Sequence, residues 1–163
     1  MDYKLRDRAP EDGEAILAIF NHYVTSSPAA YFTEPVDSRF LGMLGQAAAG
    51  FPWLVIEDAA GAVAGFGLLH RYHPAPAFKQ TAEVTYFIGP QHTRRGLGQR
   101  LLTAMEERAR RRGITMLLAS VASANEASLN FHRKQGFTEC GRLKRVGRKF
   151  GRDFDVVWLQ KSL

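Results

Sequence analysis

The stretch TRRGLGQ, residues 93–99, carries the strongest signal in this chain, because it joins a strand-like run to a helix-like run. The run before it, residues 84–88, is rich in β-branched and aromatic residues, and the run after it repeats apolar residues at helical spacing. The first N–H groups of a helix have no partner within the helix and lie at the positive end of its dipole. A glycine turn that opens a helix therefore predicts a phosphate-binding loop.

Simpler and competing interpretations of this turn exist. A Gly-x-Gly between strand and helix can be only a tight connection. The third glycine of the dinucleotide fingerprint is missing, because Gly98 is followed by Gln99, Arg100 and Leu101. The chain also lacks the Gly-Lys-Ser/Thr ending of a Walker loop. The remaining candidate is a pyrophosphate on a coenzyme other than NAD or ATP.

Size and composition indicate one ordinary folded domain, which we expect to span residues 1–163. No run of apolar residues approaches the roughly 20 that a membrane span needs, and residues 1–4 lack the apolar core of a signal peptide. The single cysteine, Cys140, excludes an intrachain disulfide and a cysteine-based metal cluster, and we expect it to be a small buried or half-buried filler. His70 and His73 are too few to form a metal site. We therefore expect no metal, no membrane partner and a cytoplasmic location.

The chain is basic, with a formal net charge of +6, and its cations gather at residues 108–112 and 142–152. Three explanations fit such clusters: a solvated surface, an anionic coenzyme or substrate, and nucleic acid. The sequence has no helix-turn-helix, zinc-finger spacing or aromatic RNA-binding motif. We therefore predict that nucleic acid is not the partner.

Hydrophobic periodicity predicts a mixed α/β order of elements. The expected strands cover residues 3–8, 53–57, 63–72, 82–88, 116–121, 137–145 and 154–161. The expected helices start at Pro10 and break at 26–28, start at Asp37-Ser38 and end at the alanines before Gly50, and cover 98–112 and 125–135. Gly65 and Gly67 inside one strand indicate a bulge or a close approach of backbones.

This order, with a phosphate loop between the fourth strand and the third helix, resembles the GNAT family of N-acetyltransferases. Residues 95–98 (RGLG) resemble the acetyl-CoA pyrophosphate loop of the family. Residues 125–128 (NEAS), followed by Phe131-His132 and Gly136-Phe137, resemble its "Asn … aromatic … Gly-Phe" segment. The resemblance covers essentially the whole chain and implies a GNAT fold, a mixed sheet of about six to seven strands flanked by about four helices.

Three further segments resemble the phosphinothricin and methionine-sulfoximine acetyltransferase branch. They are residues 32–35 (FTEP), 82–85 (AEVT) and 146–152 (VGRKFGR) with Asp155. Members of the branch usually carry Arg eight positions and Tyr five positions before the strand glutamate, where this chain has Ala75 and Phe78. The resemblance implies a homodimer with an acceptor pocket partly built at the interface, and the two replacements predict that phosphinothricin is a poor substrate.

Acetyl transfer to an amine requires a neutral amine, so a base must remove a proton from an ammonium whose pKa is about 10. Glu83 is the candidate base, because a half-buried carboxylate can have a pKa near neutrality. The alternative is an edge-strand glutamate that faces water. His132 is a candidate acid for the leaving thiolate, the alternative being a packed or surface histidine.

The resemblance implies further roles. Backbone N–H groups near Phe87 and Ile88 would stabilise the thioester oxygen. The coenzyme-binding residues would be Arg94, Arg95, Gly96, Leu97, Gly98, Gln99, Asn125, Ser128 and Lys134, with Arg100 as an additional cation and Asn125 also as a helix cap. The acceptor would be bound by Phe32, Glu34, Tyr72 and Phe78, although ordinary loop packing also explains these four.

The leading hypothesis is an acetyl-CoA-dependent N-acetyltransferase that acts on the amino group of a small amino acid or analogue similar to methionine sulfoximine or phosphinothricin. A second hypothesis is acetylation of a protein or peptide N-terminus or of a lysine. A third is a non-catalytic acyl-CoA-binding or nucleic-acid-associated module, which would release no thiol with any acceptor.

Overall fold

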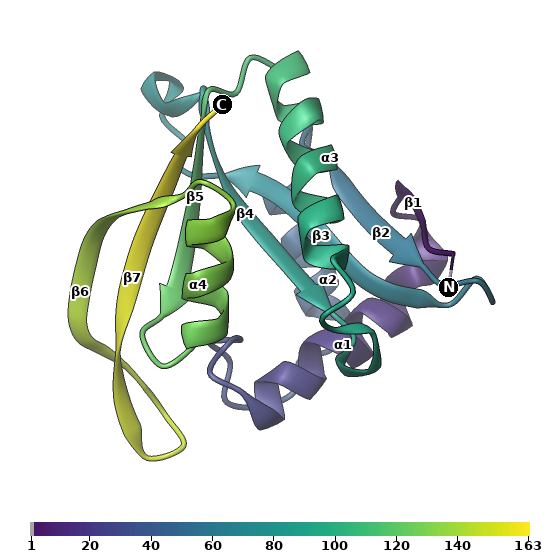
Figure 1. The fold of residues 1–163 in the computed structure, drawn as a ribbon, viewed down its shortest axis with the longest axis horizontal. Helices are drawn as coiled ribbons and strands as arrows, with labels where there is room; N and C mark the ends of the chain where they lie inside the picture. Colours follow the sequence, from purple (N-terminus) through teal and green to yellow (C-terminus); the bar gives the residue numbers. More distant parts are fainter. Residues whose placement is uncertain (1) are drawn as a thin grey trace.

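A computed structural model describes residues 2–163 and contains one seven-stranded sheet (Figure 1). The strand order is β1-β2-β3-β4-β5-β7-β6, and only the β4–β5 pair is parallel. The strands are β1 (Lys4–Asp7), β2 (Trp53–Glu57), β3 (Val63–Arg71), β4 (Thr81–Ile88), β5 (Met116–Ala122), β6 (Thr138–Lys149) and β7 (Arg152–Ser162). The α-helices are α1 (Gly13–Ser26), α2 (Ser38–Ala47), α3 (Leu97–Arg111) and α4 (Glu126–Lys134).

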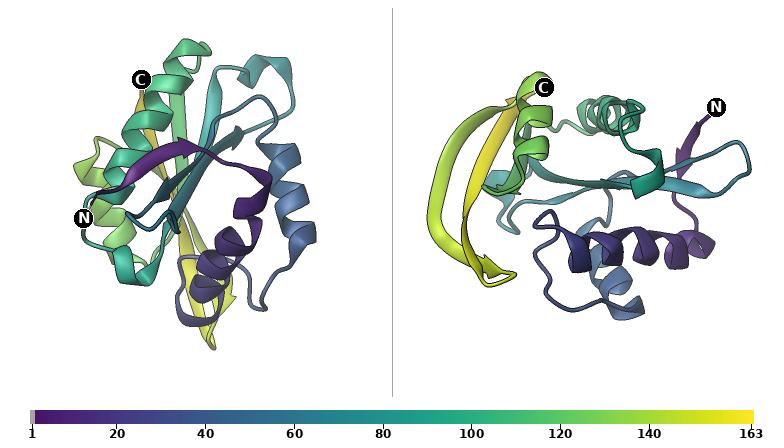
Figure 2. Two further views of the ribbon diagram at one scale, coloured as in Figure 1. Left: turned by 90° about the vertical axis from the view of Figure 1, so that its right-hand side faces the viewer. Right: turned by 60° about the horizontal axis from the view of Figure 1, so that its bottom comes forward.

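The helices cover both faces of the sheet (Figure 2). Helices α1 and α2 pack on one face over a core that includes Phe20, Phe40 and Phe66. Helices α3 and α4 pack on the other face over a core that includes Leu101 and Leu129. Alternate side chains of β4 therefore point to different helix pairs.

The helix predictions are confirmed, including two caps. The Asp37 side chain accepts a hydrogen bond from the N–H of Arg39, and the Asn125 side chain accepts one from the N–H of Ser128 at 3.2 Å. Such caps satisfy N–H groups that the helix leaves free. The chain at Pro10 forms a short 3-10 turn before α1, so the α-helix itself begins three residues later than predicted.

The two glycines of β3 lie where neighbouring groups leave no room for a side chain. A Cβ at Gly65 would lie 2.7 Å from the side chain of Ile88, and a Cβ at Gly67 would lie 3.0 Å from that of Met105. The β2–β3 register also shifts between Ile56 and Glu57, opposite Gly65. The prediction of a bulge or a close approach of backbones is confirmed, because the register shifts here and a Cβ at Gly65 would also lie 3.0 Å from the carbonyl oxygen of Phe87.

The last two strands are longer than predicted and form a hairpin that extends past the rest of the sheet (Figure 1). Strand β6 is an edge strand with almost every residue exposed, so its sequence lacks the alternation from which a half-buried strand is recognised. For the same reason the expectation of a buried or half-buried Cys140 is wrong: this residue of β6 is exposed.

Strands β4 and β5 pair over only three residues and then separate. The parallel pairing runs from Thr81–Met116 to Glu83–Leu118, and no later pair joins the two strands within residues 2–163. The five remaining residues of β4, 84–88, leave one edge of backbone unpaired in the middle of the sheet. This gap positions the site described next.

Candidate active site

A cavity of about 730 Å³ passes along the gap between β4 and β5. Residues from both separated strands line it, together with the loop before α3 and the first turn of α3. Helix α4, helices α1 and α2 and the segment between them complete the lining. Because the cavity touches elements on both faces of the sheet, two reactants can approach each other through the gap.

One end of the cavity is built by the start of α3. Gly96 is the N-cap residue and adopts a left-handed conformation with φ of 74°, and Arg94 just before it has φ of 60°. No side chain caps this helix in the described chain, and nothing lies within 4 Å of the Cβ position of Gly96. The first N–H groups of α3 therefore face open space at the positive end of the helix dipole, which suits a phosphate.

Glu83 lies on β4, at the point where the β4–β5 pairing ends. Its side chain is partly buried, and this burial raises the pKa of the carboxyl above its ordinary value, while the facing residue His70 opposes the rise. Strand β4 is central in the sheet, so the alternative of an edge-strand glutamate facing water does not describe this position. A carboxyl with a raised pKa is a weak acid, and its conjugate base is correspondingly able to accept a proton.

The face of β4 that carries Glu83 and Phe87 looks toward α1 and α2. Phe87 packs against Phe20 and Tyr23 of α1 at ring-centroid distances of 5.1 and 5.3 Å. The cavity wall on this face is mostly aromatic and aliphatic, and it includes Phe20, Tyr31, Phe32, Phe40, Met43 and Leu44. Glu83 is the one acidic side chain that lines the cavity among the described residues, and Arg94, on the α3 loop, is the one arginine or lysine.

The unpaired edge of β4 provides backbone donors. The N–H of Gly89 donates to the carbonyl of Ala64 at 2.8 Å, toward β3. Successive N–H groups in a strand alternate in direction, so the N–H of Ile88 points into the gap and that of Phe87 points to β3. The carbonyl of Ile88 also points away from β3, since it accepts the hydroxyl of Tyr23 at 2.6 Å.

On the opposite face, Tyr86, His132 and Ser128 form a partly buried hydrogen-bonded chain. His132 Nδ1 lies 2.7 Å from the carbonyl oxygen of Ser128, which can only accept, so Nδ1 carries a proton. Burial lowers the pKa of His132, which favours the neutral ring. The neutral ring has no proton on Nε2, and the Tyr86 hydroxyl donates to that atom at 2.6 Å.

The cavity brings together most of the coenzyme-binding residues predicted from the sequence. It is lined by Phe87, Ile88, Arg94, Gly96, Leu97, Gly98, Gln99, Asn125 and Ser128, and by the candidate catalytic residues Glu83 and His132. Arg95 and Lys134 are exposed and lie outside its lining.

Of the four predicted acceptor-binding residues, Phe32 alone lines the cavity. Tyr72 and Phe78 pack against each other at 5.7 Å, outside the lining, and Glu34 is exposed outside it. Sequence reasoning missed Tyr31 and Tyr86, which both line the cavity. Both residues are aromatic, which could have marked them as candidates for a binding wall, but their spacing in the sequence did not indicate that they line the same cavity.

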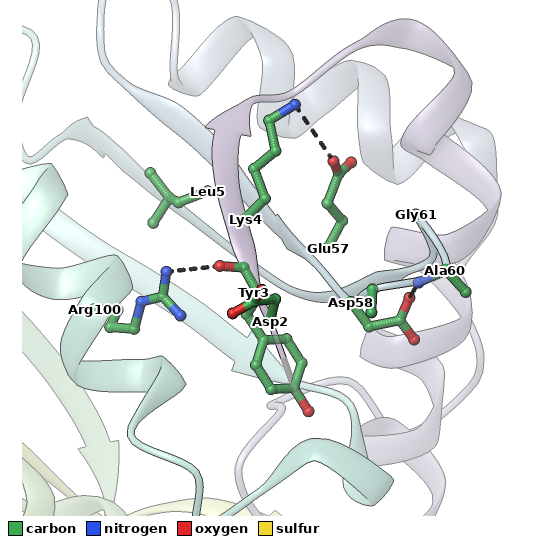
Figure 3. Close-up of a pocket in the computed structure, with 10 residues that line it drawn as sticks. Asp2, Tyr3, Lys4, Leu5, Glu57, Asp58, Ala60, Gly61 and Arg100 are labelled. Atoms are coloured by element: carbon green, nitrogen blue, oxygen red, sulfur yellow. Dashed lines mark hydrogen bonds and ion pairs between the residues drawn. The ribbon is translucent and has the colours of Figure 1, made fainter.

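A second hollow lies beside β1, at the edge of the sheet (Figure 3). Arg100 of α3 turns toward it and donates to the carbonyl of Tyr3 at 2.8 Å. This hydrogen bond engages the guanidinium away from the cavity between β4 and β5, so Arg100 does not reach the predicted phosphate loop in this arrangement.

Two other kinds of site are absent from residues 2–163. No group of three or more His, Cys, Asp or Glu side chains there could hold a metal ion. None of the helices in that range has the length and apolar character required to cross a membrane.

Comparisons with known proteins agree with this geometry. Residues 16–137 match the model of the acetyltransferase (GNAT) family. The chain is 36% identical over 165 residues to the L-methionine sulfoximine/L-methionine sulfone acetyltransferase of Pseudomonas paraeruginosa, covering 100% of this chain and 96% of that protein.

Two solved structures are similar over nearly the whole chain. A phosphinothricin acetyltransferase from Sinorhizobium meliloti in complex with acetyl-CoA has a TM-score of 0.93 and 27% identity, covering 100% of this chain and 89% of that chain. A ribosomal-protein-alanine N-acetyltransferase from Brucella melitensis has a TM-score of 0.89 and 34% identity, covering 98% and 99%.

The structure itself provides an independent test of whether acetyl-CoA fits. One continuous cavity is lined by the open N-terminus of α3, the left-handed turn before it and the unpaired edge of β4. A long coenzyme that has a pyrophosphate and a reactive end requires such a cavity. Acetyl-CoA is the co-substrate of this enzyme, which transfers an acetyl group to an amine. The family match over residues 16–137 agrees with the seven-stranded sheet and with the gap beside β4. This chain therefore belongs to the GNAT family of acetyltransferases.

Proposed function

We propose that this chain, acting as one N-acetyltransferase domain, acetylates the amino group of a small amino acid or amino-acid analogue. The observation that carries the proposal is the position of Glu83: a half-buried carboxylate on the aromatic side of the gap, across the sheet from the coenzyme-side elements. The relative from Pseudomonas paraeruginosa, named for methionine sulfoximine and methionine sulfone, supports this acceptor class.

The chain's own groups can carry each step. Acetyl-CoA, when bound, supplies the thioester carbonyl and the thiolate leaving group. Glu83 accepts a proton from the acceptor ammonium, directly or through one water. The N–H of Ile88 points into the gap and can donate to the carbonyl oxygen as negative charge develops there. Leu97, Gly98 and Gln99 offer backbone N–H groups for the pyrophosphate.

We assign His132 a positioning role. Its Nε2 accepts the hydrogen bond of Tyr86 and therefore holds no proton for a leaving thiolate. The neutral ring instead fixes the hydroxyl of Tyr86 on the wall of the cavity. This proposal replaces the direct acid role that the sequence suggested for His132.

We expect acceptors with an apolar side chain to be used at least about tenfold better than phosphinothricin, measured as kcat/KM. Phosphinothricin would bring a second anionic group close to Glu83, and burial of such a group is costly without a nearby cation. Within the described residues, the cavity lining on the face of Glu83 contains no cation. The measurement is release of CoA thiol from acetyl-CoA with methionine sulfone, methionine sulfoximine, leucine, phosphinothricin and a short peptide that begins with alanine.

The panel also separates the competing functions. A peptide that outperforms every free amino acid would favour protein acetylation, an alternative supported by the Brucella melitensis neighbour. Acetyl-CoA binding without thiol release for any acceptor would favour a non-catalytic module. Either result would contradict the proposed function.

We further propose a homodimer formed through the β6–β7 hairpin. Leu143 and Val146 of the edge strand β6 are 51% and 57% exposed, and Phe150 in the hairpin turn that follows is 59% exposed. Clustered apolar side chains on an exposed edge strand are unusual unless a partner covers them.

The single cysteine is compatible with the reducing cytoplasm, where we place the enzyme.

Val146→Asp is expected to convert the dimer to a monomer, because it places a charge in the apolar centre of the contact. Light scattering after size exclusion should change from about twice 18.2 kDa to that mass. Thr103→Asp adds the same charge to an exposed position of α3 and should leave the mass unchanged. A wild-type protein that is already monomeric at micromolar concentration would refute the homodimer.

A further inference from the structure

Lys149, the last residue of β6, is a buried cation that forms no ion pair among residues 2–163. The residue as a whole is 6% exposed. The ammonium donates to the carbonyl oxygens of Ser27 and Ala30, each at 2.7 Å, and to that of Tyr23 at 3.4 Å. An ammonium has three donors, so three carbonyl groups from a distant part of the chain use all of them.

These carbonyl groups belong to the end of α1 and to the segment that continues into the cavity wall. Helix α1 ends at Ser26, and a cation near its C-terminal carbonyl groups interacts favourably with the helix dipole. Ala30 is directly followed by Tyr31 and Phe32, which line the cavity on the Glu83 side. Lys149 therefore joins the hairpin to the segment that forms this wall.

A second set of contacts holds the same segment from the sheet side. The Tyr31 hydroxyl lies 2.9 Å from the Ser120 hydroxyl of β5, and its ring stacks on Phe154 of β7 at 5.9 Å. Phe154 faces Gly147, where a Cβ would lie 2.1 Å from its ring, so this ring occupies the space above the glycine. The wall segment is thus held between the hairpin and β5.

Burial of an ammonium without a carboxylate is costly, and it lowers the pKa of Lys149. A methionine of similar length would avoid that cost, but it would leave the carbonyl oxygens of Ser27 and Ala30 without this donor. The energetic advantage of lysine here lies in fixing those carbonyl groups in one place.

We propose that Lys149 is a positioning residue for the acceptor: it holds residues 27–32 where Tyr31 and Phe32 form the cavity wall on the Glu83 side. The proposal rests on the proposed function for the identity of that wall as the acceptor side. It predicts that loss of the ammonium loosens this segment and impairs use of the acceptor, while the coenzyme loop at the start of α3 is unaffected.

The test compares Lys149→Met with Lys4→Met, which removes an exposed lysine from β1, away from the hairpin and from the cavity. For Lys149→Met in the free enzyme, hydrogen–deuterium exchange should become faster in peptides covering 27–36 and stay unchanged in peptides covering 93–105. The control variant should change exchange in neither region. The acceptor kcat/KM should fall about tenfold or more through displaced contacts, with the Kd of acetyl-CoA unchanged. Lys149→Arg, which keeps a charge and several donors, should lie between the wild type and Lys149→Met.

Unchanged exchange in 27–36 would overturn the proposal whatever the acceptor. A uniform rise of exchange in all peptides, or a parallel rise in the Kd of acetyl-CoA, would show a global stabilising role and would also overturn it. If Lys149→Met does not fold, the same comparison is made with Lys149→Arg. A wild type that turns over no acceptor would contradict the proposed function, while the exchange data would still decide the role of Lys149.

Discussion

Replacement of Glu83 by glutamine is expected to lower kcat/KM for the acceptor about 10²- to 10⁴-fold at neutral pH, with little change in the Kd of acetyl-CoA. Glutamine keeps the size and polarity of the side chain but cannot accept a proton from an ammonium. Steady-state kinetics and equilibrium binding of acetyl-CoA measure the two quantities. Glu107→Gln, an exposed position on α3, is the matched control and should change neither.

The pH dependence of this deficit distinguishes a base from a binding group. Burial raises the pKa of Glu83, so wild-type activity should fall as the pH decreases through a value higher than that of an ordinary glutamate. At pH values above the amine's own pKa of about 10, most of the acceptor is already neutral and needs no base. The ratio of wild-type to variant kcat/KM should therefore shrink with rising pH, and a ratio independent of pH would contradict the role of Glu83 as base.

The fold could be predicted largely from the sequence because its elements satisfy local rules. Asp37 and Asn125 are caps, Gly65 and Gly67 lie where neighbouring groups leave no room for a side chain, and the apolar repeat of α3 packs on the core. The β6–β7 hairpin was predicted too short because edge position and exposure on both faces remove periodicity.

The candidate site was predictable where a short motif builds it and not where distant segments meet. The loop at 93–99 and Glu83 could be found from local sequence and the family resemblance. Tyr31 comes into position through contacts with Ser120 and Phe154, about 90 and 120 residues away along the chain, which no local pattern contains. Tyr72 and Phe78 were acceptor candidates through the family resemblance, but they pack on each other outside the cavity lining.

Gly96→Asp is expected to raise the Kd of acetyl-CoA at least about tenfold more than Gly96→Asn does, through repulsion of the phosphates. Gly96 has φ of 74° and open space at its Cβ position, so both variants fit sterically and carry the same backbone strain. The two side chains have the same shape and differ in charge. Their difference in Kd, measured by calorimetry, therefore isolates the electrostatic effect at the start of α3.

The other end of the same helix provides the control. Gly113 follows α3, has φ of 73° and also has nothing within 4 Å of its Cβ position. Gly113→Asp imposes a similar strain and the same charge far from the cavity, so it should leave the Kd of acetyl-CoA unchanged even where it lowers the melting temperature. Equal effects of Gly96→Asp and Gly96→Asn would mean that the turn before α3 does not bind phosphate, and the pyrophosphate site would then have to lie elsewhere along the cavity.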